Sequence, residues 1–203
     1  NDIARSAFIK KQVKDTSTAT VNALVKHIRS GNFLPREYEL RIAHGRVDRV
    51  DTFEDGNNIY VKVIDYKSGN KVFNVTETFL GLQMQLMVYL KDTVDYIKKN
   101  NPDKNVYPAA GLYFHVYDPY VSEIDCEKAV SDFRKNNPDS ELSDEELKKM
   151  AIEKERFKAY RMSGLVAKEI EIVNAMDHDT ITKTGSSAIL PVNITKSGVD
   201  ARS

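Results

Sequence analysis

The chain has 203 residues, of which 41% are hydrophobic and 30% are charged, and this composition is typical of a globular domain with a substantial core. Lys and Arg together number 30, as do Asp and Glu, so the chain lacks the overall basic charge that often accompanies nucleic-acid binding. The single cysteine, Cys126, excludes an internal disulfide and a zinc or iron–sulfur centre built from cysteines of this chain alone.

The location and extent of the protein can also be predicted from the sequence. No apolar run reaches the ~20 residues that a membrane-spanning helix needs, and we expect no secretory leader. One cysteine fits a reducing compartment, so we expect a cytoplasmic protein with no membrane partner. Because the sequence starts at Asn1 without Met, we expect residues 1–203 to be a single domain taken from a larger chain.

The N-terminal part of the sequence predicts a long helix followed by a strand. Apolar residues at helical intervals predict a helix over residues 3–29, which Gly31 would end. His27 lies near the C-terminal end of this helix, where the helix dipole favours a cation, so we expect a surface or capping role rather than metal ligation. Alternating apolar and charged residues predict a strand over residues 33–42, with Glu39 on a polar face that is either solvated or part of a site.

Two runs rich in β-branched residues flank a Gly-Asn turn at positions 56–57 and predict a β-hairpin over residues 45–67. The turn sets a register in which Asp48 lies opposite Asp65 on one face of the sheet. Lys67 comes two residues after Asp65 and therefore projects from the same face. The hairpin is thus predicted to gather two carboxylates and one ammonium group on a small patch.

Such a patch fits metal-assisted hydrolysis of phosphodiesters. Asp48 and Asp65 supply hard oxygen ligands that suit Mg²⁺ or Mn²⁺. A bound divalent metal polarises the scissile phosphate and lowers the pKa of a bound water. Lys67 can orient that water and offset charge in the transition state. The alternative is a surface hairpin whose Asp and Arg residues form solvated salt pairs, and the local pattern alone leaves both interpretations open.

The segment after the hairpin predicts a crossover helix. Asn74, with Glu77 three residues later, is a suitable helix start, and the helix is predicted to run to about residue 100, before Pro102. Gln85 and Tyr89 are four residues apart and share one face of this helix. They are either an ordinary surface pair or part of the same site.

The rest of the sequence predicts one interior strand and two peripheral segments. Residues 108–118 are apolar or aromatic at alternate and intervening positions, as expected for a strand buried on both faces. Residues 119–163 are predicted to be a helical insertion or flank, in which Ser143 and Glu146 form a capping box. Residues 186–203 are predicted to be an exposed hairpin or tail.

Three motifs, in this order, carry a family resemblance: Gly45-Arg-Val-Asp-Arg49, Ile64-Asp-Tyr-Lys-Ser-Gly69 and Gly81-Leu-Gln-Met-Gln-Leu-Met-Val-Tyr-Leu90. Together they resemble the RecB-like nucleases of the PD-(D/E)XK superfamily, and residues 33–203 are most similar to the AddB family of helicase–nuclease subunits. The resemblance implies an α/β restriction-endonuclease-like core. Its mixed central sheet would consist of an antiparallel three-stranded meander, a crossover helix and a further strand, flanked by helices.

The resemblance also implies roles for individual residues. Asp48 and Asp65 would bind Mg²⁺ or Mn²⁺ with help from the Tyr66 carbonyl, and Lys67 would be the catalytic lysine. A Gln-x-x-x-Tyr motif would place two further residues at the active site, where they shape it and contact DNA: Gln85 and Tyr89. Glu39 is a further candidate site residue.

Two features depart from the family pattern. The family has a metal-binding histidine well upstream of the first Asp, and His27 is too close to Asp48 to match it, so we expect that ligand outside this chain. The AddB family also carries four cysteines for an iron–sulfur cluster. Cys126 matches none of them, so we expect no iron–sulfur ligands in this chain.

The function implied by the resemblance is divalent-metal-dependent hydrolysis of DNA phosphodiester bonds. The domain would act as an exonuclease on strands unwound by a partner helicase, in double-strand break repair and recombination. Its partners would be DNA and an AddA-like helicase–nuclease subunit. The alternative is a non-catalytic DNA-binding or scaffolding module that retains a nuclease fold.

Overall fold

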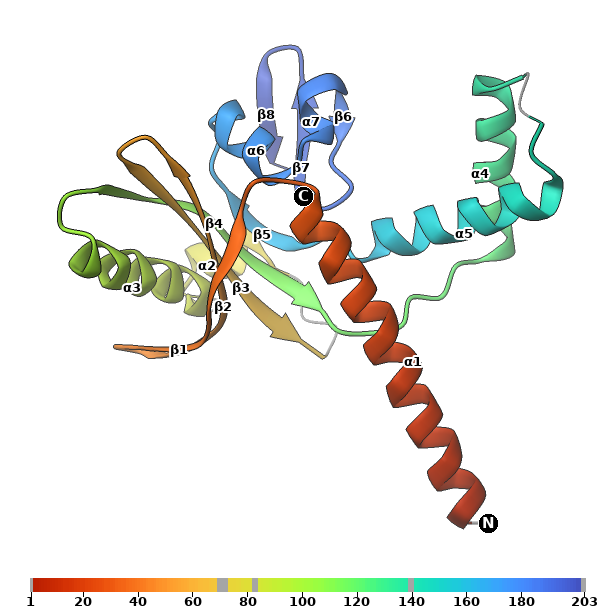
Figure 1. Cartoon of the computed structure of the whole chain (residues 1–203), viewed down its shortest axis with the longest axis horizontal. Coiled ribbons are helices and arrows are strands. Elements are labelled where there is room, and N and C mark those ends of the chain that lie inside the picture. Colours follow the sequence, from red (N-terminus) through yellow and green to blue (C-terminus); the bar gives the residue numbers. More distant parts are fainter. Residues whose placement is uncertain (1, 69–72, 82–83, 139–140, 202–203) are drawn as a thin grey trace.

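A five-stranded sheet forms the centre of the computed structural model, which describes residues 2–68, 73–81, 84–138 and 141–201. In spatial order the strands are Leu34–Ile42 (β1), Gly45–Asp55 (β2), Asn58–Lys67 (β3), Asn105–His115 (β4) and Ser163–Val166 (β5). β1, β2 and β3 form an antiparallel meander, β4 runs parallel to β3, and β5 is antiparallel to β4 (Figure 1). This topology confirms the predicted α/β, restriction-endonuclease-like fold.

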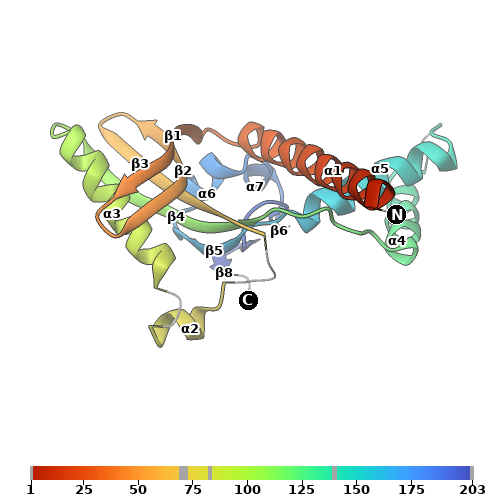
Figure 2. The same ribbon diagram turned by 90° about the horizontal axis from the view of Figure 1, so that it is seen from below.

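Helices cover both faces of the sheet. The longer helices are Asp2–Arg29 (α1), Gln85–Asn100 (α3), Glu123–Asn136 (α4) and Asp144–Ala159 (α5). The short ones are Val75–Phe79 (α2), Ile170–Met176 (α6) and Asp179–Thr182 (α7). The N-terminal half of α1 and the α4–α5 pair extend away from the sheet (Figures 1 and 2). No helix in the described parts of the chain is long and apolar enough to cross a membrane.

The core has two halves, one on each face of β3. Ile59, Val61 and Val63 lie on one face and pack with Tyr89 and other apolar residues of α3. The opposite face carries Ile64, which packs with residues of α1, β4 and α6. Burial on both faces explains why β3 is so rich in β-branched residues, since a central strand has no solvated side.

The predicted hairpin register is confirmed. Asp55 pairs with Asn58, and the same register continues to the pair of Arg49 and Ile64. Gly56 has φ of +56°, which a two-residue turn of this kind requires and which glycine adopts without strain. One further step along this register brings Asp48 opposite Asp65.

The crossover segment differs from the single helix predicted over residues 74–100. Asn74 caps the start as expected, because its side chain accepts a hydrogen bond from the Glu77 backbone N–H (3.1 Å). The helix then ends at Phe79, and α3 starts only at Gln85. Gly81 between them has φ of +80°, a left-handed conformation that interrupts a right-handed helix. Three residues of the quoted motifs lie outside the described residues: Gly69, Leu82 and Gln83.

The prediction of a surface or capping role for His27 was wrong. Only 5% of this residue is exposed, and its ring packs edge-on against Phe114 and Phe157. Burial, followed by the charges of Lys62 and Arg49, lowers its pKa to about 3, so the imidazole is neutral. Tertiary packing of α1 against the sheet therefore outweighs the preference of a helix C-terminus for a cation.

Two peripheral segments complete the fold. Residues 119–163 contain α4 and α5, and α5 begins with the capping box formed by Ser143 and Glu146. Near the C-terminal end, β7 (Val192–Thr195) pairs with β8 (Gly198–Ala201) and with β6 (Gly185–Ser186). This hairpin is less exposed than predicted, because Leu190, Val192 and Ile194 belong to the core.

Candidate active site

The candidate site lies where β2 begins and β3 ends. Asp48 of β2 accepts a hydrogen bond through Oδ2 from the backbone N–H of Tyr66 in β3 (2.7 Å). This contact places the Asp48 carboxylate beside the Asp65–Lys67 segment. Asp65 is 5% exposed and forms an ion pair with the Lys67 ammonium group, which remains partly accessible. The hairpin therefore gathers the two acids and the lysine around the backbone of Tyr66.

Lys67 is held as a cation. Partial burial lowers the pKa of its ammonium group, but the hydrogen bond and the charge of Asp65, together with the charge of Asp48, outweigh that effect and raise it overall. A lysine with a raised pKa stays protonated near neutral pH. Lys67 is therefore suited to donate hydrogen bonds and to balance negative charge, and it is not suited to accept a proton.

Tyr113 of β4 forms one wall of the site, and the sequence analysis did not select it. The parallel register pairs Asp65 with Tyr113, so both side chains project from the same face. The Lys67 ammonium lies 5.2 Å from the centre of the Tyr113 ring, within the range of a cation–π contact. The ring is fully buried, and its hydroxyl has no hydrogen-bond partner among the described residues. A tyrosine on a predicted interior strand next to the hairpin was the signal that could have identified it.

The α3 helix brings Gln85 and Tyr89 to the start of β2. Gln85 Nε2 donates a hydrogen bond to the Tyr89 hydroxyl (2.8 Å). The Tyr89 ring lies so close to Gly45 that a Cβ at that position would be 2.8 Å from the hydroxyl oxygen. Gly45 also has φ of +151°, so the close contact and the backbone conformation both require glycine. The Gln-x-x-x-Tyr motif of α3 is thus packed against β2 at a point three residues before Asp48.

A second contact fixes α3 against the same end of the hairpin. Asp92 accepts hydrogen bonds from the His44 backbone N–H (3.2 Å) and from His44 Nδ1 (2.8 Å). The hydrogen bond to the His44 side chain, followed by its charge, lowers the pKa of Asp92. Because His44 and Gly45 are adjacent, this contact and the Tyr89 packing hold one helix against the β1–β2 turn.

Glu39 does not share the contacts of the other candidates. It lies on β1 and forms an ion pair with Arg46 (2.7 Å), and more than half of its side chain is exposed. Its φ of +52° is unusual for a residue other than glycine. No contact described for Glu39 joins it to Asp48, Asp65 or Lys67.

The opposite face of the same strands carries a buried charge network that sequence reasoning missed. Arg49 donates two hydrogen bonds to Asp51 (2.7 and 2.8 Å), and Lys62 forms an ion pair with Asp51 (3.0 Å). All three side chains are at most 5% exposed. Arg49 also donates to the Tyr66 hydroxyl (3.2 Å). Tyr66 is thus held from both faces, by Asp48 through its backbone and by Arg49 through its side chain.

The donor set fits a hard divalent cation only in part. Asp48 and Asp65 offer carboxylate oxygens on adjacent strands, and the Tyr66 carbonyl lies between Asp65 and Lys67 in the chain. Within the described residues, no group of three or more His, Cys, Asp or Glu side chains is arranged to hold a metal ion. Two carboxylates and a backbone carbonyl would therefore need further oxygen ligands from water or substrate, which is common for Mg²⁺.

The fold and the site together define an α/β protein of the restriction-endonuclease type, with two acids and a lysine on adjacent strands. A family model described as "PD-(D/E)XK nuclease superfamily" matches residues 1–181, and the chain belongs to this superfamily.

The chain is also similar to several proteins named as AddB-type subunits of an ATP-dependent helicase/deoxyribonuclease. The protein of that name from Clostridioides difficile is 32% identical over 98% of this chain and 17% of its own length. The one from Thermoanaerobacter sp. is 31% identical over 96% of this chain and 16% of its own length. The one from Clostridium acetobutylicum is 29% identical over the whole chain and 17% of its own length. The chain thus spans about a sixth of these relatives, and the resemblance to AddB-type subunits is confirmed.

Proposed function

We propose that the chain is a nuclease domain that hydrolyses DNA phosphodiester bonds with the help of Mg²⁺ or Mn²⁺. The observation that carries the proposal is the gathering of Asp48, Asp65 and Lys67 around the backbone of Tyr66. The superfamily match and the names of the relatives support this interpretation.

The residues divide the work. Asp48, Asp65 and the Tyr66 carbonyl would hold the divalent ion, which when bound polarises the scissile phosphate and supplies an activated water. Lys67 stays protonated, orients the attacking water by hydrogen bonding, and offsets the negative charge that develops on the phosphate. The hydrogen bond from the Tyr66 N–H fixes the direction of the Asp48 carboxylate before substrate arrives.

The remaining parts of the site serve the substrate. Gln85 and Tyr89 shape the site from α3 and contact the DNA strand. We propose that the strand is delivered by a partner helicase, an AddA-like subunit, and that the domain acts as an exonuclease in double-strand break repair and recombination. The names of the relatives support a helicase context, because each joins "helicase" and "deoxyribonuclease".

Two substitutions test the assignment in the full-length protein with its helicase partner, ATP, Mg²⁺ and end-labelled DNA. Asp65→Ala and Lys67→Ala should each reduce cutting by at least about 10²-fold, because each removes a group that acts on the reacting phosphate. Lys91→Ala is the matched control, since Lys91 lies on the exposed surface of α3 and pairs only with Asp95 in the described contacts. Full Mg²⁺-dependent cutting by either site variant would refute the proposal.

A scaffolding module that retains the nuclease fold is the competing function. It differs in its response to metal. A working site should raise the melting temperature as Mn²⁺ is added, because a ligand that binds only the folded state stabilises it by mass action, and Asp65→Ala should abolish the rise. A scaffold would show no metal-linked rise and no cutting in the wild-type protein.

A further inference from the structure

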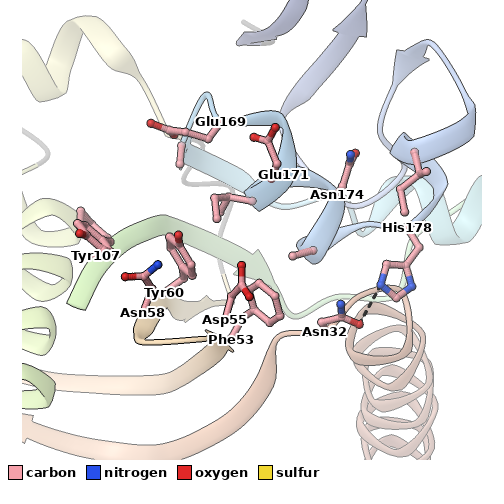
Figure 3. Close-up of a pocket in the computed structure, with 15 residues that line it drawn as sticks. Asn32, Phe53, Asp55, Asn58, Tyr60, Tyr107, Glu169, Glu171, Asn174 and His178 are labelled. Atoms are coloured by element: carbon pink, nitrogen blue, oxygen red, sulfur yellow. Dashed lines mark hydrogen bonds between the residues drawn. The ribbon is translucent and has the colours of Figure 1, made fainter. Parts of the chain in front are cut away.

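A cavity of about 820 Å³ lies far from the candidate active site. Its walls come from the turn end of the β2–β3 hairpin, the start of β4, and the α6 and α7 helices (Figure 3). Asp55 at its edge and Asp48 in the active site are at opposite ends of β2, which are roughly 20 Å apart at the usual rise of a strand. The volume is within the range of pockets that bind ligands or peptide side chains.

Stacked aromatic rings form one wall of the cavity. Phe53 and Tyr60 are stacked with centroids 6.0 Å apart and planes at 21°, and Tyr60 and Tyr107 are stacked at 5.7 Å and 27°. They come from three adjacent strands, so the sheet holds the rings at fixed spacing. Tyr107 remains 45% exposed, although its neighbours in the sheet are covered. The rings therefore present flat π surfaces toward the cavity.

Carboxylates occupy both sides of the cavity. Asp55 projects from the hairpin, and Glu169 and Glu171 lie at the start of α6, on the other side in Figure 3. The described lining contains no Lys or Arg. Among the described residues none of the three carboxylates forms an ion pair. This contrasts with Glu54, next to Asp55, which pairs with both Arg36 and Lys104.

We propose that this cavity is a docking site for an arginine side chain carried by a segment of polypeptide. Arginine matches the two features of the cavity at once, because its planar guanidinium group stacks on aromatic rings and its fork of N–H donors binds carboxylates. The uncompensated negative charge disfavours nucleic acid, since phosphates would face carboxylates. The amides of Asn58 and Asn174 in the lining offer hydrogen bonds to the backbone of such a segment.

The size of related proteins supplies a source for the segment. The chain corresponds to 16–17% of the length of the relatives, so most of each relative lies outside the region that matches this chain. We place the occupant in the assembly that contains this domain, either on the same longer chain or on a partner subunit. Docking at this cavity does not depend on catalysis at Asp48 and Asp65, so each proposal can fail alone.

Photo-crosslinking in the purified full-length protein with its partner subunit tests the docking site. A benzophenone side chain replaces Tyr107 on β4 or Ile181 on α7, two residues of the lining from opposite elements. The matched control replaces Tyr120, which is 90% exposed and lies outside the lining. The crosslinked peptides are then identified by mass spectrometry. We expect both cavity positions to label one segment that contains an arginine, and the control position not to label it.

Neutralising the carboxylates shows whether charge selects the occupant. The triple variant Asp55→Asn, Glu169→Gln, Glu171→Gln should lower the crosslinking yield roughly tenfold, which corresponds to about 1.4 kcal/mol. Millimolar arginine amide should compete with the crosslink, whereas citrulline amide, which has no charge, should not. The melting temperature of the triple variant should stay within about 2 °C of the wild type, because none of the three carboxylates forms an ion pair among the described residues.

Several outcomes would overturn the proposed docking site. A labelled segment without arginine, a crosslink to DNA, or equal competition by citrulline amide would each do so. Absence of any crosslink from both cavity positions would also count against it, provided that the wild-type assembly cuts DNA. Loss of cutting by Asp65→Ala is irrelevant to this test, so failure here and failure of the nuclease assignment remain distinguishable.

Discussion

Acid should destabilise the protein through one buried histidine. His27 has a pKa of about 3 in the folded protein, because burial and then the charges of Lys62 on β3 and Arg49 on β2 disfavour its protonation. In the unfolded chain its pKa should return to the ordinary value of 6.5. The unfolded state therefore binds a proton more readily, and stability falls as the pH drops below about 6.5 until the loss levels near pH 3.

The magnitude follows from the two pKa values. Between pH 7 and pH 5 the unfolded chain gains most of one proton at this site while the folded protein gains almost none. The linkage relation then gives a loss of about 2 kcal/mol in the free energy of unfolding. His27→Phe removes the titration and keeps an aromatic ring between Phe114 and Phe157. His27→Leu is a second variant in case the phenyl ring is too large for the site.

Urea unfolding at pH 7 and at pH 5 measures the effect. Other titrating groups contribute equally to the wild type and to the variants, so the informative quantity is the difference between their pH dependences. We expect the wild type to lose about 2 kcal/mol more than either variant between the two pH values. A difference below about 0.5 kcal/mol would show that His27 is not a buried neutral group, and the burial argument would then be wrong.

Three further predictions concern the packing around the candidate site. Asp51→Ala should cost about 3–5 kcal/mol in urea unfolding because it leaves buried cations unpaired, whereas Lys62→Met should cost less than about 1.5 kcal/mol because the remaining pair is neutral; equal losses would contradict this. Gly45→Ala should lower stability by about 1–3 kcal/mol, because its Cβ would collide with Tyr89, and an unchanged midpoint would contradict that contact. Tyr113→Leu should reduce kcat for DNA cutting several-fold with little change in KM, since the ring supports the ammonium above it, whereas Tyr113→Phe, which keeps the ring, should restore kcat; equal kcat for Leu and Phe would refute that role.

Local features of the sequence determined the hairpin, the helix starts and the order of the motifs. The Gly-Asn turn at 56–57 fixes the register of β2 and β3, because a two-residue turn allows only one pairing of the flanking strands. Ser143 and Asn74 cap their helices through bonds to residues three positions away. Such interactions span only a few residues, so the sequence alone is enough to predict them.

Only the tertiary structure decided which polar residues are buried and which distant residues meet. His27 would be a surface residue on an isolated helix, but α1 packs it against β4 and α5. Arg49 and Lys62 belong to strands that alternate polar and apolar residues, and only the layer of helices above them makes their charges internal. Tyr113 reaches Lys67 through the parallel pairing of β3 and β4. Burial and cross-strand contact depend on residues far apart in the chain, because they arise from packing and not from local periodicity.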